Sequence, residues 1–156
     1  MDFDELYQNY WQKVFRLCMG YVNDYATAQD LAQETFISAW KHFGGFRNEA
    51  HIGTWIYRIA TNHCLRSLER KRRVHTTDLP PNLLEEQQPD TEPHMRLLYR
   101  FISELPEIDR IVISLELEGV KQAEIAQITG LGESNIRVKI HRIKQRLTQK
   151  FNEHAT

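Results

Sequence analysis

Apolar residues recur at steps of three and four along most of this chain, which is the spacing of one face of an α-helix. The stripes occupy residues 3–21, 31–43, 52–64, 95–105 and 108–115, and a further one consists of Ile136, Ile140, Ile143 and Leu147. Each stripe is long enough to bury one side of a helix against its neighbours. No segment alternates apolar and polar residues with a period of two over a useful length, which argues against a sheet. The pattern therefore predicts an all-α fold.

Glycine, proline and short polar residues mark the ends of several predicted helices. The second helix starts near Asp24 or Thr27, either of which can cap it, and stops before Gly44-Gly45. Pro106 suits the first turn of the fifth helix, because proline fits there without the loss of a hydrogen bond.

Four of the five prolines fall between positions 80 and 93, in a stretch without apolar periodicity. Proline fixes φ and lacks a backbone donor, so this stretch cannot form a continuous helix or a central strand. It is also acidic, which favours an extended, solvated chain. We interpret residues 75–93 as a flexible linker that spans at most about 60–70 Å. It joins two small helical domains, residues 1–74 and 94–156.

Charge is distributed in blocks that the net charge of −1 conceals. The blocks carry +6 over residues 41–75 and +5 over 134–156, against −4, −5 and −3 over 1–40, 76–93 and 94–133. Two basic segments, each beside an acidic one, indicate contact with a polyanion at two places. Solvated helix faces whose charges happen to cluster would give the same pattern.

The composition excludes several classes of protein. No run approaches the ~18 apolar residues of a spanning helix, so we expect no membrane insertion. The acidic N-terminus lacks the basic-then-apolar order of a signal peptide. Cys18 and Cys64 are too few for a secreted disulfide framework and lack the spacing of a zinc site. We therefore expect a cytoplasmic protein with no metal and no other cofactor.

Residues 121–147 carry the sharpest local signal, that of a helix-turn-helix. This motif needs a small residue where two helices cross closely, which is Ala126, and a glycine in the turn, which is Gly130. It also needs a β-branched residue that closes the core, which is Ile136. Lys121, in contrast, is a poor cap for the first helix. In a major groove, the second helix would set its first turns on base edges and its later cations on phosphates. An ordinary hairpin with a solvated basic face is the alternative, but turn and charge together favour DNA binding.

The predicted helix over residues 30–43 combines an acidic face with aromatic residues. Asp30, Gln33 and Glu34 share one face, because positions three and four apart are neighbours on a helix. With Trp40 behind them, they form a candidate docking site for a basic protein partner. Taken alone, the same pattern is more often the solvated side of an amphipathic helix.

Residues 46–73 form a basic segment with polar residues along one side. A helical wheel places together Thr54, Arg58, Thr61, Asn62, Arg66, Glu69 and Arg73. Asn62 can hydrogen-bond a base edge, the arginines can pair with phosphates, and Phe46 can stack on an exposed base. A helix C-terminus whose cations complement the helix dipole is the alternative interpretation of the basic run 70–73.

The order of these parts resembles the extracytoplasmic-function branch of the sigma-70 family of RNA polymerase sigma factors. The resemblance rests on DLAQETFISAW, FRNEAHIGTWIYRIATNHCL, the acidic Pro-rich linker, LPEIDRIVISLELEGVKQAEIAQITG and NIRVKIHRIKQRL, in this order. It implies a bacterial transcription initiation factor, built from regions 2 and 4, that binds core RNA polymerase and directs it to promoters. It implies no catalytic residue. It also implies an anti-sigma protein as a partner.

The resemblance implies three sets of contacts, carried over by position. The clamp helices of the polymerase β′ subunit would meet Asp30, Gln33, Glu34 and Trp40. The −10 element would meet Phe46, Arg47, Asn48, Arg58, Asn62 and Arg66. The −35 element would meet Arg137, Val138, Lys139, His141 and Arg142, while region 4 would also contact the β flap. Family members often have Ser or Thr at Lys121, Gly132 and Val138, so the promoter sequence stays open.

Three other functions fit parts of the sequence. A stand-alone helix-turn-helix regulator would leave the acidic helix and residues 46–73 without a role. A metalloenzyme could use Asp30, Glu34 and His63, but no HExxH pattern is present and His63 falls on the apolar stripe, which indicates a core histidine. An antagonist of another factor would not need base-reading residues on two helices. We therefore expect a DNA-binding transcription factor, whose acidic blocks make the free chain bind promoters poorly.

Overall fold

The computed structural model describes residues 2–46, 51–73 and 92–155, apart from the side chains of residues 68–73. Every regular element within these ranges is helical, which confirms the predicted all-α fold. The elements are α1 (Phe3–Val22), α2 (Tyr25–His42), the 3-10 turn η1 (Phe43–Gly45), α3 (Ile52–Arg73), α4 (Pro93–Ser103), α5 (Glu107–Leu117), α6 (Gln122–Thr129) and α7 (Glu133–Ala155).

The helix ends follow the predicted signals closely. Asp24 is the cap of α2, and its carboxylate accepts a 3.0 Å hydrogen bond from the backbone N–H of Thr27. Pro106 directly precedes α5, and Gly130 ends α6 with φ +80°. Lys121 makes no side-chain hydrogen bond to the start of α6, in agreement with its poor capping chemistry.

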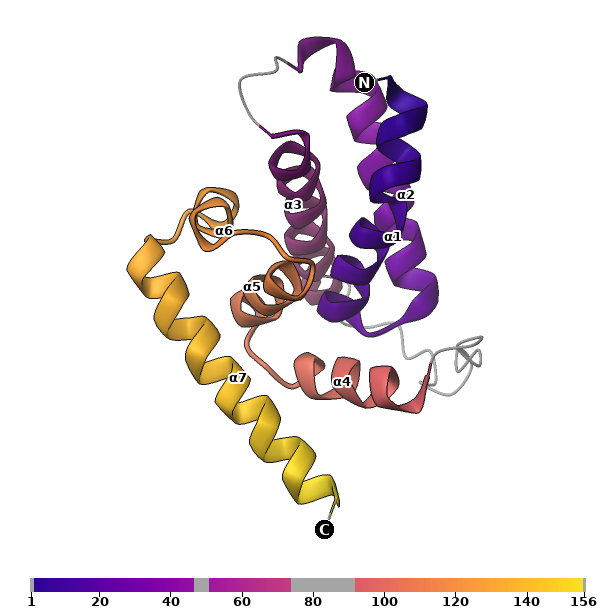
Figure 1. Ribbon diagram of the computed structural model, residues 1–156. Helices are drawn as coiled ribbons and strands as arrows, with labels where there is room; N and C mark the ends of the chain where they lie inside the picture. The colour runs from indigo at the N-terminus through magenta and orange to yellow at the C-terminus, as the bar shows by residue number, and fades with distance from the viewer. Residues whose placement is uncertain (1, 47–50, 74–91, 156) are drawn as a thin grey trace.

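Helices α1, α2 and α3, with η1, form the N-lobe of the molecule (Figure 1). The three helices pack against one another in pairs, so each buries its apolar stripe against the other two. Buried side chains from the three helices include Leu6, Leu17, Leu31, Phe36, Ile56 and Ala60.

Helices α4 to α7 form the C-lobe, in which α7 lies along the outer edge as one long helix (Figure 1). α7 packs against α4, α5 and α6. Its buried residues, Ile136, Ile140, Ile143 and Leu147, follow the predicted stripe. The stripe is confirmed, and it leaves the opposite side of α7 open to solvent.

The two lobes are in direct contact, and their buried side chains form one continuous core. α5 and α4 pack against α1, and α6 packs against α3 (Figure 1). The arrangement places α6, the first helix of the helix-turn-helix, beside α3.

Two sequence predictions lie wholly or largely outside the described residues. These are the −10 contacts Arg47 and Asn48, and the flexible linker over residues 75–93. Only the end of that linker is described, where Pro93 begins α4. The proposed domain limits at residues 74 and 94 therefore stay predictions.

Candidate functional site

The four residues expected at the polymerase divide between two neighbouring hollows beside α2. Asp30 and Glu34 line a pocket between α2 and α3, whereas Gln33 and Trp40 line a groove between α1 and α2. All four residues are exposed, and Trp40 keeps 65% of its surface accessible. The predicted set is therefore accessible, but it does not form one flat face.

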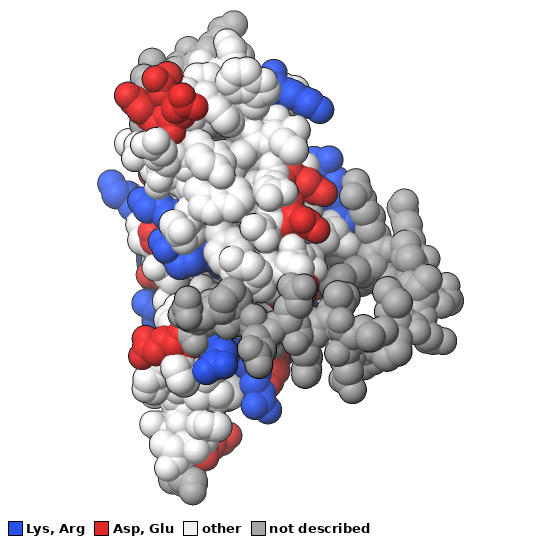
Figure 2. Space-filling model, turned by 90° about the vertical axis from the view of Figure 1, so that its right-hand side faces the viewer, with Lys and Arg blue, Asp and Glu red and all other residues white. Residues whose placement is uncertain are grey.

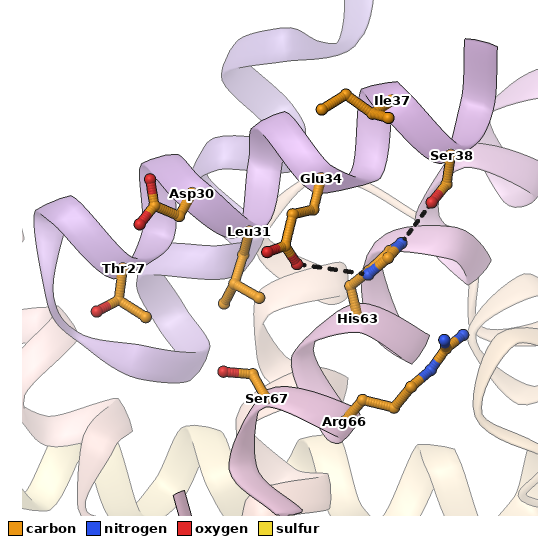
Figure 3. A pocket seen from close by; sticks show the side chains of 9 residues that line it. All are labelled: Thr27, Asp30, Leu31, Glu34, Ile37, Ser38, His63, Arg66 and Ser67. Atoms are coloured by element: carbon orange, nitrogen blue, oxygen red, sulfur yellow. Dashed lines mark hydrogen bonds and ion pairs between the residues drawn. The ribbon is translucent and has the colours of Figure 1, made fainter. Parts of the chain in front are cut away.

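The pocket between α2 and α3 is polar and has a volume of about 370 Å³. Glu34 and Ser38 lie one turn apart on α2, and His63 of α3 reaches between them (Figure 3). The Nε2 atom of His63 lies 2.8 Å from the Ser38 hydroxyl, and its Nδ1 atom lies 3.7 Å from the Glu34 carboxylate. The prediction that His63 is a core histidine is therefore wrong. Its ring faces the polar residues Ser38 and Glu34 of α2 and not the buried apolar residues of that helix.

The arrangement of Ser38, His63 and Glu34 resembles the catalytic triad of a hydrolase only superficially. Ser38 lies inside α2, where the backbone N–H groups are bonded within the helix and cannot stabilise an oxyanion. The 3.7 Å separation of His63 and Glu34 also exceeds a hydrogen bond. Among the described residues, no group of three or more His, Cys, Asp or Glu could hold a metal ion. The chemistry offered by Asp30 and Glu34 is the binding of a cationic side chain.

The groove between α1 and α2 is strongly apolar and was not predicted as a unit. Its volume is about 380 Å³, and its lining is Phe3, Tyr7, Trp11, Gln33, Phe36, Ile37 and Trp40. Tyr7 and Ile37 expose 42% and 55% of their surface, although both are apolar enough to be buried. Figure 2, which looks from the side of α1 and α2, shows a broad uncharged surface with both acidic and basic side chains at its edges. An exposed apolar area of this kind marks an interaction surface.

A sequence signal for this groove was available. Gln33, Ile37 and Trp40 follow one another at helical spacing, and Tyr7 stands one turn after Phe3. Tyr7 and Ile37 are not members of the predicted stripes but lie beside them on each helix, and spacing alone does not say whether a third element covers such residues. In the structure α3 packs on another side of both helices, so this surface stays open.

The predicted −10 residues lie along one side of α3 and at its approach. Arg58, Asn62 and Arg66 are exposed at successive turns of α3. The centre of the Phe46 ring lies 5.2 Å from that of the Trp55 ring. Arg58 donates a hydrogen bond of 3.4 Å to the carbonyl of Gln127 in α6, and Arg66 lines the pocket of Asp30 and Glu34.

Two members of the predicted polar side of α3 are not accessible. Thr54 and Thr61 are only 5% and 1% exposed, so the helical-wheel grouping is wrong for both. The reason is that α3 packs against three helices, α1, α2 and α6, which leaves a narrow strip of it in solvent. Among the side chains of α3 that the structure describes, residues 52–67, the exposed ones are Arg58, Asn62 and Arg66.

The helix-turn-helix is present as predicted, in α6, the turn at Gly130 and α7. Arg137, Val138, His141 and Arg142 are exposed on the side of α7 away from its buried stripe. Ser134 is also exposed, one turn before Arg137 and Val138, and extends this surface toward the start of α7.

Lys139 departs from the other members of the predicted −35 set. Its ammonium group lies 3.0 Å from the carboxylate of Asp109 in α5, and 28% of its side chain is exposed. The ion pair directs Lys139 toward the body of the C-lobe, which indicates a part in holding α7 against α5.

The two cysteines belong to the core of the N-lobe. Cys18 and Cys64 are buried free thiols whose sulfur atoms lie 3.9 Å apart. Hydrogen bonding to Cys64 and burial raise the pKa of the Cys18 thiol well above its usual value. The Cys18 thiol is therefore disfavoured as a thiolate nucleophile.

Both halves of the chain match sigma-70 family models. Residues 6–74 match the model of Sigma-70 region 2, and residues 95–147 match the model of Sigma-70 region 4. In the described part of the chain, no helix combines the length and apolarity that a membrane crossing requires.

Several known proteins are similar to this chain over most of its length. RNA polymerase sigma-H factor of Pseudomonas aeruginosa is 31% identical over 92% of this chain and 82% of its own length. ECF RNA polymerase sigma factor SigM of Bacillus subtilis is 28% identical over 97% of this chain and 96% of its own length. Among solved structures, the sigma factor RpoE of Bartonella quintana, in complex with the anti-sigma factor NepR, superposes with a TM-score of 0.80 at 19% identity, covering 97% of each chain. CnrH, in complex with the cytosolic domain of CnrY, superposes with a TM-score of 0.70 at 20% identity, over 97% of this chain and 88% of CnrH.

Proposed function

The chain belongs to the sigma-70 family as an extracytoplasmic-function sigma factor, and from this premise we propose how its surfaces divide the work of transcription initiation. The N-lobe holds core RNA polymerase through α2 and contacts the −10 element through α3. The C-lobe contacts the −35 element through α7. The observation that carries the proposal is the match of regions 2 and 4, in order, to two lobes that each present an exposed polar strip.

The hollows beside α2 suit the two kinds of side chain that a helical partner presents. The carboxylates of Asp30 and Glu34 can form charge-assisted hydrogen bonds with basic side chains of the β′ clamp helices. The groove lined by Tyr7, Ile37 and Trp40 can take apolar side chains from the same partner. Aromatic residues at the centre and charges beside them are the usual composition of a strong protein interface.

Asn62 and the arginines of α3 support contact with the −10 element. Promoter opening requires the unstacking of bases, at a few kcal/mol per base. Stacking on Phe46 and hydrogen bonds from Asn62 to an extruded base would offset this cost. Arg58 and Arg66 would then hold the backbone of the same strand.

The exposed side of α7 supports contact with the −35 element. Arg137, Val138, His141 and Arg142 occupy the part of the helix that meets base edges in a major groove. Phosphate contacts release counterions and add affinity that does not depend on sequence. Polymerase, bound by the N-lobe at α2 and by the C-lobe at the β flap, would raise the effective concentration of each lobe at its own element.

An anti-sigma protein belongs to the same proposal. The two solved structures compared above are complexes, of RpoE with NepR and of CnrH with the cytosolic domain of CnrY. A protein that fills the groove between α1 and α2 would compete with polymerase for Trp40 and Ile37.

Charge reversal on α2 tests the polymerase surface. The double variant Asp30→Lys and Glu34→Lys should lower the affinity for purified core polymerase by about tenfold or more, because it sets cations against a basic partner. Glu153→Lys, an exposed change of the same sign at the far end of α7, should leave this affinity unchanged. Fluorescence anisotropy of labelled chain against core polymerase measures both. Equal affinities for the three proteins would contradict the assignment of α2.

A further inference from the structure

The lysines and the arginines of α7 have different surroundings. Each of its three lysines forms an ion pair with a carboxylate of α5 or of the residue that ends α4; the lysines are Lys139, Lys144 and Lys150. Its three arginines are all exposed, and among the described residues none of them forms an ion pair; they are Arg137, Arg142 and Arg146. The division by residue type indicates that the two kinds of cation have different tasks.

Lys139 is held by α5. Its ammonium group lies 3.0 Å from the carboxylate of Asp109, and only 28% and 19% of the two side chains are exposed. Salt screens an ion pair that is largely withdrawn from solvent less than it screens a surface pair. Lys139 is therefore directed inward, although Arg137 and Arg142, its basic neighbours in the sequence, are exposed.

Lys150 is held in a similar way near the end of α7. Its ammonium group pairs with the carboxylate of Glu104 and lies 5.8 Å from the centre of the Phe101 ring. Hydrogen bonding from Lys150 lowers the pKa of Glu104, and only 17% of the Lys150 side chain is exposed. The ion pair and the contact with the ring both direct this lysine toward α4.

Lys144 is the most exposed of the three lysines. Its ammonium group lies 3.5 Å from the carboxylate of Glu116 in α5, and 57% of its side chain is exposed, against 21% for Glu116. The other carboxylate oxygen of Glu116 is buried and has no hydrogen-bond partner in the part of the chain that the structure describes. Because a partly buried charge without a partner is costly, Lys144 stabilises Glu116 in this position.

The three ion pairs hold α7 from both sides of its buried stripe. Lys139 and Lys150 are eleven positions apart, which is almost three full turns, so they lie on the same side of the stripe. Lys144 lies on the other side, five positions after Lys139. α4 and α5, which supply the carboxylates, pack against the inner side of α7 (Figure 1). Ion pairs on both sides oppose a rotation of α7 about its own axis, and such a rotation would turn the arginines away from solvent.

We propose that Glu104, Asp109 and Glu116 are positioning residues of the −35 surface. They hold α7 through its lysines, and they keep these lysines from pairing with DNA phosphates, so that the contact with DNA falls to the arginines. The part that concerns DNA rests on the proposed function of α7. Arginine suits this contact, because its planar fork pairs with guanine or phosphate through two hydrogen bonds, whereas lysine is a point charge.

The assignment changes the set of −35 contacts that the family resemblance implies. It removes Lys139, whose charge is already paired with Asp109. It adds Arg146, which is exposed one turn after Arg142 and extends the same surface along α7.

The salt dependence of DNA binding separates the arginines from the lysines. Each phosphate contact steepens the slope of log affinity against log salt by about 0.9. In the full chain, Arg142→Ala should therefore make the slope shallower by about 0.9, whereas Lys139→Ala should leave it unchanged. Fluorescence anisotropy with a labelled duplex of random sequence, between about 50 and 200 mM salt, measures both. Equal changes in the two variants would overturn the proposal.

Release of a paired lysine gives the converse test. Asp109→Asn should free Lys139 for a phosphate, steepen the slope by about 0.9 and raise the affinity at low salt about fivefold or more. Addition of Lys139→Ala should remove this gain, and Asp109→Glu, which keeps a carboxylate, should retain the original slope. Glu124→Gln is the matched control, because it removes the same charge from α6, where no ion pair with a described lysine is present. It should leave the slope unchanged.

A purely structural ion pair predicts a different result for Asp109→Asn, namely a lower melting temperature with an unchanged slope. That result would overturn the proposal. Glu116→Gln covers the case in which Asp109→Asn disturbs folding, since Lys144 is already more than half exposed and its release should disturb α7 less. It should steepen the slope in the same way, and an unchanged slope in this folded variant would also overturn the proposal. Circular dichroism checks that each variant keeps its helices.

Run-off transcription with the reconstituted holoenzyme distinguishes a failure of this inference from a failure of the proposed function. If the slopes change as expected but the chain confers no start sites on core polymerase, the positioning role stands and the proposed function fails. If the chain confers start sites but Lys139→Ala lowers the slope as much as Arg142→Ala does, the proposed function stands and the positioning role fails.

Discussion

Single side chains decide where the helices of the N-lobe begin and which of their residues reach solvent. The sequence left Asp24 and Thr27 as equal candidates for the cap of α2, and the structure assigns the cap to Asp24. The same limit affected Thr54 and Thr61, which a helical wheel placed with the exposed arginines. Periodicity identifies the face of a helix on which a residue lies, but it does not predict how many other helices pack against that helix. Local chemistry was therefore predictable, and accessibility was not.

Replacement of the cap tests the residue scale. Asp24→Ala removes the acceptor of the Thr27 backbone N–H and of the Thr27 hydroxyl, and should lower the free energy of unfolding by about 1 kcal/mol. Thr27→Ala keeps the backbone hydrogen bond and should cost less. Urea unfolding followed by circular dichroism measures both variants. A larger loss in Thr27→Ala than in Asp24→Ala would contradict the assignment.

The helical elements were the best predicted level of the structure. The apolar stripes correspond to α1 to α5 and α7, and Gly130 ends α6 where the turn was expected. The sequence indicated less clearly which side chains on each helix face contact another helix and which reach solvent. Lys139 falls on the predicted basic side of α7, yet it pairs with Asp109 of α5, a residue 30 positions away that no local pattern connects to it. The aromatic groove was missed for the same reason, since its openness depends on where α3 packs.

Two glycines beside the turn of the helix-turn-helix form a matched pair at the element scale. Neither Gly130 nor Gly132 has an atom within 4 Å of an added Cβ, but only Gly130 has a positive φ, of +80°. Gly130→Ala should therefore lower the free energy of unfolding by about 1–2 kcal/mol through backbone strain alone. Gly132→Ala should change it by no more than about 0.5 kcal/mol. Thermal and urea unfolding compare the two, and equal losses would argue against a left-handed turn at Gly130.

The contact between the lobes is the level that the sequence did not predict. The acidic, Pro-rich segment indicated two domains but carried no information on how they meet. The crossing of α1 with α5 depends on Gly20 and Ser114, which are unremarkable in their own helices, and on pairs as distant as Arg16 and Glu118. Sequence motifs identify regions 2 and 4 separately and do not show how the two regions pack against each other.

Run-off transcription with purified core polymerase on genomic fragments tests the central claim most directly. Addition of the chain should confer defined start sites that core polymerase alone does not use. The variant Arg137→Glu and Arg142→Glu should abolish them while core binding survives, because both changes lie on the exposed side of α7. Arg96→Glu, an exposed change on α4, is the matched control and should keep the same start sites. Transcription that is equally unselective with and without the chain would contradict the account.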